Sequence, residues 1–330
     1  FSSDYEDTVP KVLDFRSEKT SEASLDAISG RTIRYLSEVQ DYVKYISSET
    51  KEEEWQRTPK LPNLSGISAE QAAQSFVANT GLRHTLLSKA PYDFTAYELV
   101  RRKVEQFGII VQHASVQDRT VKGACLHDES EEAHVIWINT YLQNSKSRIF
   151  TLLHEVGHIL TGNSGFSSTF DIENNVEAHC NKFAANVLLP RQEFSDAVER
   201  LTSRYDVESN DMVNALSKEF VASKHAIVIR LIELGFGSRE FISNWLSQFD
   251  DVLLPEEITR GGPAAERDEG RIKLAKFGFR LAEAVASGLE VGITSAIEVF
   301  EVIRLKPKYL EDWLRASRER KSFIDALEKE

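Results

Sequence analysis

Two histidines and a glutamate form the pattern His154-Glu155-x-x-His158 inside an otherwise apolar stretch, residues 149–160. If this stretch is a helix, His154 and His158 lie one turn apart on the same face, where both imidazoles can bind one metal ion. This spacing is typical of zinc hydrolases, in which the glutamate after the first histidine acts as general base on a water molecule. The pattern therefore predicts a hydrolytic zinc site with Glu155 as the catalytic base.

A catalytic zinc ion takes three protein ligands, so the two histidines need a partner. Glu177 lies nineteen residues after His158, near the start of a predicted helix that Pro190 ends. The segment between the two helices, residues 161–174, is rich in glycine, asparagine and serine and is predicted to be a loop. Such a loop lets the helices pack antiparallel and brings Glu177 to the metal. Glu173 is a rival ligand, but it lies nearer the loop.

Asn181 follows Glu177 by four residues and therefore shares its helix face. There it can hydrogen-bond the outer nitrogen of a zinc-bound histidine and fix its tautomer. Cys180 could also approach the metal, but a small buried packing residue is the favoured interpretation. The chain has two cysteines, Cys125 and Cys180, in unlike contexts. They predict no disulfide framework, which is typical of a cytoplasmic protein.

At these residues the chain resembles the ImmA/IrrE family of zinc metallopeptidases. The resemblance rests on residues 148–158 and 177–190. In the second segment the family pattern is a glutamate, then Ala-Asn-x-Phe-Ala, then Leu-Leu-x-Pro, and Cys180 replaces the usual alanine. Residues 135–139 resemble the family strand that precedes the active-site helix. The resemblance covers most of residues 60–245 well and the two ends loosely.

The resemblance implies that His154, His158 and Glu177 bind one Zn²⁺ and that Glu155 is the general base. Family members cut helix-turn-helix transcriptional repressors and so release stress-response or mobile-element genes. It therefore implies a peptide-bond hydrolase whose protein substrate is a DNA-binding repressor. Residues 13–16 resemble an Asp-Phe-Arg element that often follows an N-terminal helix-turn-helix in longer members.

Two other functions compete with this reading. One is a DNA- or protein-binding regulator whose metal site is not catalytic. Structural zinc sites usually have four cysteine or histidine ligands, whereas only three ligands are clear here, which favours catalysis. The other is a broad peptidase, against which the additional helical regions argue. The sequence leaves the oligomeric state open.

The composition is ordinary for a globular chain of two or three domains, with 330 residues, 41% hydrophobic and 28% charged. No apolar run approaches the roughly 20 residues that span a bilayer. The first residues lack the positive charge and apolar core of a secretion signal. The chain also starts without methionine, so a trimmed or processed end is expected. A net charge of −12 argues against direct, extended contact with nucleic acid. It could speed encounter with a basic substrate, although plain solubility is the favoured interpretation.

The fold class expected is α+β and mostly helical, with a zincin-like peptidase domain whose small β-sheet lies beside the His-Glu-x-x-His helix. Strands are predicted at residues 109–111, 123–126 and 133–139, and helices at residues 21–55, from 68 onward and at 94–107. The predicted domains are an N-terminal arm and helix, the peptidase domain, a helix-turn-helix-like region and a C-terminal helical unit, at residues 1–60, 61–195, 196–255 and 256–330.

Within the third region, residues 216–235 predict helix, turn and helix, with Ser223 as the cap of the second helix. Few basic residues lie on that helix, so a structural or docking role is favoured over DNA binding. A tetrahedral oxyanion would need a further hydrogen-bond donor, which the sequence does not place. Arg148 is expected at the surface or behind a ligand. The remaining candidates for this hydrogen-bond donor are His113, His127, His134 and His179.

Overall fold

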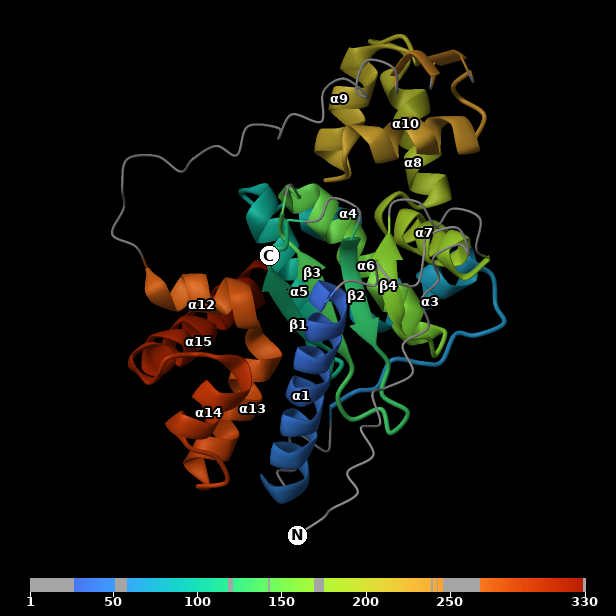
Figure 1. The fold of residues 1–330 in the computed structure, drawn as a ribbon. Coiled ribbons are helices and arrows are strands. Elements are labelled where there is room, and N and C mark those ends of the chain that lie inside the picture. Colours follow the sequence, from blue (N-terminus) through green and yellow to red (C-terminus); the bar gives the residue numbers. More distant parts are fainter. Residues whose placement is uncertain are drawn as a thin grey trace.

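The computed structural model describes residues 27–50, 58–117, 121–141, 143–168, 175–238, 240–241, 243–245 and 268–328. Residues 1–26, which include the Asp-Phe-Arg element, residues 246–267 and Glu173 lie outside the described ranges. The helices, labelled as in Figure 1, are α1 (Ala27–Thr50), α3 (Ala69–Thr80), α4 (His84–Ser88), α5 (Asp93–Glu105), α6 (Ser145–Leu160), α7 (Asn175–Leu188), α8 (Arg191–Leu201), α9 (Asn210–Glu219), α10 (Lys224–Glu233), α12 (Glu269–Phe277), α13 (Phe279–Glu290), α14 (Ala296–Ile303) and α15 (Leu310–Leu327).

A four-stranded sheet in the order β1-β3-β2-β4 lies at the centre of the molecule (Figure 1). Strand β1 (Ile110–Ala114) is parallel to β3 (Val135–Asn139), and β2 (Val121–Leu126) is antiparallel to β3. These three strands were expected from their apolar runs, and β3 is buried along its whole length. With the helices around them they confirm the α+β, mostly helical fold class.

The fourth strand, β4 (Gly165–Ser168), corrects the expectation that residues 161–174 form only a loop. It pairs antiparallel with β2, across a register shift between Val121 and Gly123. Its sequence, Gly-Phe-Ser-Ser, has little intrinsic strand preference and no long alternation. Hydrogen bonding to the edge of β2, a contact that local sequence does not encode, therefore makes this segment a strand.

Helices α1 and α6 cover opposite faces of the sheet. In the β2–β3 ladder Gly123 lies opposite Ile138, and Ala124 lies opposite Trp137. Successive strand residues face opposite sides, so Gly123 and Trp137 belong to different faces. Gly123 faces α6, because a Cβ atom there would lie 2.5 Å from Glu155 Oε1. Trp137 instead lines a pocket together with residues of α1.

The structure has the predicted helix, turn and helix within residues 210–233. Helices α9 and α10 pack against each other, and the hydroxyl of Ser223 accepts a hydrogen bond from the backbone N–H of Ala226. Ser223 is thus the N-cap of α10, as predicted. Val221 in the turn adopts a left-handed conformation with φ of 53°. The division of the chain into four domains stays a prediction.

The C-terminal helices, in orange and red in Figure 1, pack against α1, α5 and the β1 edge of the sheet. Two buried charges of α5 make this junction. Arg101 donates hydrogen bonds to the carbonyl oxygens of Leu274 and Ala275, at the end of α12. Glu105, which pairs with Arg101, accepts a hydrogen bond of 2.9 Å from the N–H of Phe279, at the start of α13. Helix α5 therefore caps the ends of both helices.

Gly278 joins α12 to α13 at φ 83° and ψ 179°, a conformation that is essentially limited to glycine. A Cβ atom at Gly278 would lie 2.1 Å from Glu105 Oε1 and 2.8 Å from the carbonyl oxygen of Val111. The buried carboxylate and the strand backbone thus approach this position directly, which requires a residue without a side chain.

Substitution of Gly278 by alanine should lower the free energy of unfolding by about 3 kcal/mol, since strain and overpacking act together. Urea unfolding monitored by circular dichroism measures this loss. Gly292→Ala is the matched control, because Gly292 has a φ of 75° but no heavy atom within 4 Å of an added Cβ. It should cost only about 1 kcal/mol. Equal losses for the two variants would contradict the close packing at the junction.

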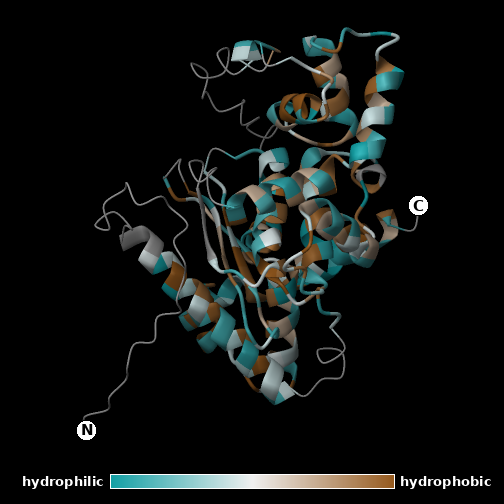
Figure 2. Cartoon of the chain, turned by 90° about the vertical axis from the view of Figure 1, so that its right-hand side faces the viewer, coloured by the Kyte–Doolittle hydropathy of each residue, from teal (hydrophilic) through white to brown (hydrophobic). Residues whose placement is uncertain are grey.

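The helices are amphipathic, and hydrophilic and hydrophobic residues alternate along them in Figure 2. Among the described residues, no helix combines the length and apolarity needed to cross a membrane.

Candidate metal centre

Helix α6 places His154, Glu155 and His158 inside the protein. The helix begins after Asn144, whose side chain accepts a hydrogen bond from the N–H of Ser147. Every residue from Thr151 to Leu160 is buried, because the sheet, α5 and α7 surround this part of the helix. An apolar surface on all sides is what such an enclosed helix requires. The three polar side chains within it are therefore withdrawn from water.

Helix α7 lies close along α6 and carries Glu177. The two helices meet at Gly157, where an added Cβ atom would lie 3.2 Å from the Cα of Cys180. Glycine therefore permits a backbone approach that a larger residue would prevent. Cys180 is fully buried at this contact, in agreement with a packing role. The sequence analysis did not single out Gly157; a glycine inside an apolar helix was the available signal.

The structure brings together the three predicted ligand residues. The Nε2 atoms of His154 and His158 lie 3.1 Å apart. Each is 3.0 Å from a different oxygen of the Glu177 carboxylate. Among the described residues, this is the only cluster of three or more histidine, cysteine, aspartate or glutamate side chains arranged to hold a metal ion.

Asn181 pairs with His154 on the side of the ring away from Glu177. Its side-chain oxygen lies 2.9 Å from His154 Nδ1. An amide oxygen only accepts hydrogen bonds, so Nδ1 donates and carries the proton of the neutral imidazole. His154 Nε2 then presents a lone pair toward His158 and Glu177. Asn181 therefore occupies the position expected for it, behind a ligand histidine.

The donor set fits a zinc ion. Nitrogen and oxygen ligands lie about 2.0–2.2 Å from zinc, so two ligands of a tetrahedral ion are about 3.3 Å apart. Here the two Nε2 atoms are 3.1 Å apart, and each lies 3.0 Å from one oxygen of the Glu177 carboxylate. The lone pair of His154 and a carboxylate oxygen of Glu177 face each other at such a distance, and a cation between them removes their repulsion.

The electrostatics of the cluster keep Glu177 ionised, as a metal ligand must be. Burial alone would raise the pKa of Glu177, but hydrogen bonds from the protonated forms of His154 and His158 outweigh it and lower the pKa to about 2. Burial likewise opposes the charged form of His154, whereas Glu177 and Glu155 raise the pKa of that imidazole above its ordinary value.

Glu155 lies next to the ligands, with its carboxylate against strand β2. An added Cβ atom on Gly123 would lie 2.5 Å from Glu155 Oε1 and 3.0 Å from Cγ2 of Thr151. The strand thus leaves room for the carboxylate only because Gly123 has no side chain. Sequence reasoning missed Gly123, although a glycine within a predicted strand often marks a close approach.

Asn181→Ala should weaken zinc binding 10- to 100-fold, the usual cost of losing a residue that orients a ligand histidine. A competition titration against a chromophoric chelator measures the affinity. Lys182→Ala, the exposed next residue on α7, is the control and should bind zinc as the parent does. Asn181→Asp keeps an acceptor for His154 Nδ1 and should retain most of the affinity. Unchanged zinc binding in Asn181→Ala would contradict this role.

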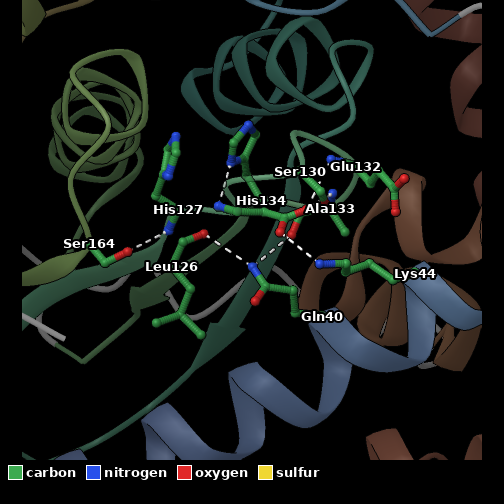
Figure 3. Close-up of polar contacts among 10 residues, drawn as sticks. Gln40, Lys44, Leu126, His127, Ser130, Glu132, Ala133, His134 and Ser164 are labelled. Atoms are coloured by element: carbon green, nitrogen blue, oxygen red, sulfur yellow. Dashed lines mark hydrogen bonds and ion pairs between the residues drawn. The ribbon is translucent and has the colours of Figure 1, made fainter. Parts of the chain in front are cut away.

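His127 and His134 belong to a separate polar cluster that docks α1 onto the β2–β3 connection (Figure 3). Their rings lie 4.9 Å apart, and His134 Nδ1 accepts a hydrogen bond from the N–H of Asp128. Gln40 of α1 donates to the carbonyl oxygen of Ala133 at 2.8 Å. These contacts indicate that both histidines stabilise the packing of α1 against the sheet and lie outside the cluster of predicted metal ligands.

Asp128 anchors this cluster with one nearly buried carboxylate. It accepts hydrogen bonds from Lys44 Nζ at 2.8 Å, from the hydroxyl of Ser130 at 2.7 Å and from the N–H groups of Glu132 and Ala133. Burial by itself would raise the pKa of Asp128, but these hydrogen bonds outweigh it and hold the pKa well below its usual range.

The stabilisation by ionised Asp128 should be fully present above its unfolded pKa, near 4, and decline as the pH falls toward the lower folded value. Asp128→Asn should lower the free energy of unfolding by about 1–3 kcal/mol at pH 7, because charge-assisted hydrogen bonds are lost. Urea unfolding at several pH values should show a constant difference from the parent between pH 5 and 8, and a shrinking difference below pH 4. A pH-independent difference would contradict this account.

The remaining candidate donors lie in other settings. His113 is buried, and its Nε2 pairs with the hydroxyl of Tyr97. Burial, followed by the charges of Arg101 and Arg148, holds the pKa of His113 well below its usual value. Burial and then the charges of His158 and Lys182 lower the pKa of His179.

Comparison with known proteins gives a family match over the region that contains this centre. Residues 104–231 match the Peptidase_M78 model, described as the IrrE N-terminal-like domain. The match includes the whole of α6 and α7 and the sheet beside them. No curated protein matches the chain.

Proposed function

We propose that this chain, whose residues 104–231 belong to the IrrE N-terminal-like peptidase family, is a zinc-dependent endopeptidase that cuts one protein substrate at a specific site. The family match supports a metallopeptidase. The observation that carries the zinc-dependent reading is the convergence of His154, His158 and Glu177, with donor atoms 3.0–3.1 Å apart.

The proposed roles follow from the chemistry of each side chain. His154, His158 and Glu177 hold the ion, and Asn181 orients His154 through Nδ1. A zinc ion so bound supplies Lewis acidity, which polarises a carbonyl group and makes water more acidic. Glu155 accepts a proton from the attacking water and passes it to the amine that leaves when the peptide bond breaks.

The surroundings of Glu155 suit proton transfer. The carboxylate is fully buried beside the ligands and is held between α6 and Gly123 of β2. Removal from bulk water strengthens the electrostatic interactions of the reacting groups. The carboxylate is also on the residue adjacent to a ligand, so the helix itself sets its position relative to the ion.

The substrate that we propose is a helix-turn-helix transcriptional repressor, whose cleavage would derepress stress-response or mobile-element genes. The family resemblance supports this substrate. The net charge of −12 is complementary to a basic DNA-binding protein and would favour encounter with it.

A comparison of new protein N-termini tests this proposal. A lysate from a host that encodes the chain is treated with the zinc-loaded protein or with its Glu155→Gln variant. We expect one N-terminus, or very few, that appears only with the active protein and lies within a DNA-binding regulator. Many cuts would support a broad peptidase instead. No difference between the two proteins, together with binding of a regulator by both, would support the alternative of a non-catalytic metal-containing regulator.

A further inference from the structure

A second candidate site lies on the other face of the sheet from the metal centre. An open pocket of about 550 Å³ is lined by α1, the β1–β3 side of the sheet and the C-terminal helices, which lie beside one another in Figure 1. It opens on the Trp137 face, whereas Glu155 lies on the Gly123 face. A volume of this size is typical of small-molecule sites, which often form where separate structural units meet.

Three cationic side chains from three different elements line this pocket. Arg31 comes from α1, Lys276 from the end of α12, and Arg304 from the residue that follows α14. Among the described residues, the lining contains no aspartate or glutamate, although the chain as a whole has a net charge of −12. A local excess of positive charge on an acidic protein attracts anions selectively to that place.

Two of these cations are not neutralised by the protein. Within the described ranges, neither Lys276 nor Arg304 forms an ion pair, although many other surface lysines and arginines do. Burial, and then the charge of Lys273, lower the pKa of Lys276. A bound anion would favour the charged form of Lys276.

The backbone at Arg304 gives an independent indication. Arg304 caps α14 in a left-handed conformation with φ of 58°. Glycine or asparagine adopts this conformation more easily, and an arginine there retains some strain. Strain at a lining residue is typical of positions where the side chain serves binding. The helix end thus holds a long cationic side chain at the mouth of the pocket.

The rest of the lining is uncharged. Trp137 is 3% exposed and forms part of the sheet surface. Burial raises the pKa of Tyr35, so its hydroxyl stays neutral. An aromatic or apolar group can pack on such a surface while the cations bind a charged group.

We infer that this pocket binds a small phosphorylated molecule, with the phosphate held by Arg31, Lys276 and Arg304 and its uncharged part against Trp137 and Tyr35. A phosphate offers several acceptor oxygens to cations that come from different directions, and arginine matches its geometry well. Because the cations belong to α1 and to the C-terminal helices, the bound molecule would tie both ends of the described chain to the sheet.

Calorimetric titration of the full chain with adenosine monophosphate, inorganic phosphate and adenosine tests this inference without any assay of proteolysis. We expect saturable binding of adenosine monophosphate, weaker binding of phosphate and none of adenosine. Arg304→Asn and Lys276→Gln should each weaken binding of adenosine monophosphate about 10- to 100-fold, the range for a lost hydrogen bond to a charged group. Lys306→Gln, an exposed residue outside the pocket, should change it less than about twofold.

Thermal unfolding separates a lost ligand contact from a lost fold. Asparagine tolerates the left-handed conformation, so Arg304→Asn should unfold at the same temperature as the parent or slightly higher. Adenosine monophosphate should raise the melting temperature of the parent and not that of the variant. The inference is overturned if neither adenosine monophosphate nor phosphate binds saturably. It is also overturned if Arg304→Asn binds like the parent, or if Lys306→Gln weakens binding as much as the pocket variants do.

Discussion

Glu155→Gln should bind zinc as the parent does and yet lose at least about 100-fold, and up to 10,000-fold, in the rate of substrate cleavage. Glutamine has nearly the same shape as glutamate and fits the same space against Gly123, but it cannot accept the proton of the attacking water. Since Glu155 is not one of the three clustered donors, its neutralisation leaves the ligand set intact. The rate of appearance of the specific N-terminus in the treated lysate measures the loss.

Two controls make this result specific. Zinc content, measured by atomic absorption, should stay at one ion per chain in both proteins, so that lost activity does not reflect lost metal. Glu199→Gln changes the same functional group on the exposed surface of α8 and should leave the rate unchanged. A Glu155→Gln variant that cleaves at the parental rate would show that another group acts as the base.

The helix-based expectations succeeded because they depend on short-range geometry. His154 and His158 had to share a face of α6, and Glu177 and Asn181 had to share a face of α7, whatever the rest of the fold did. Only the approach of the two helices was non-local, and their apolar faces favour packing against each other. The fold class followed in the same way from the alternation of helical stretches and three apolar strands. The roles of the four residues remain predictions.

What the sequence did not reveal depends on contacts between distant segments. Gly123 and Gly157 matter because Glu155 and Cys180 happen to approach them, and neither approach has a local signal beyond the glycine itself. The strand β4 exists because β2 offers it an edge. Likewise, the sequence gives Arg101 and Glu105 no feature that distinguishes them from solvated helix charges. Only the folded chain shows that they cap α12 and α13, more than 170 residues away.

The cationic pocket shows the same limit. Arg31, Lys276 and Arg304 are far apart in the sequence, and each alone resembles a solvated surface charge. Net charge, which is a sum over the whole chain, argued only against extended contact with nucleic acid and gave no sign of a local anion site. The convergence of α1 with the C-terminal helices creates a local positive field that no composition measure contains.

Glu177→Ala should abolish stable zinc binding. A complete zinc site contributes about 10–16 kcal/mol from four ligands, so one ligand accounts for about 2.5–4 kcal/mol, or roughly two to three orders of magnitude in affinity. Glu177 contributes the negative charge of the cluster, and its two oxygens contact both histidines. The variant should lose zinc on dialysis against a moderate chelator, whereas Glu199→Ala on the exposed face of α8 should keep it.

Thermal unfolding provides a second readout of the same loss. Zinc raises the melting temperature of a protein that binds it in the folded state, by an amount that depends on the ratio of its concentration to the dissociation constant. The parent should show this rise and Glu177→Ala should not, although both unfold cooperatively without zinc. Full zinc occupancy in Glu177→Ala would transfer the ligand role to Glu173 or Cys180. Cys180 is buried against Gly157 and burial raises the pKa of its thiol, which disfavours the thiolate that binds zinc. Cys180→Ser in the Glu177→Ala background tests this: zinc kept by the double variant would point to Glu173, and zinc lost would point to Cys180.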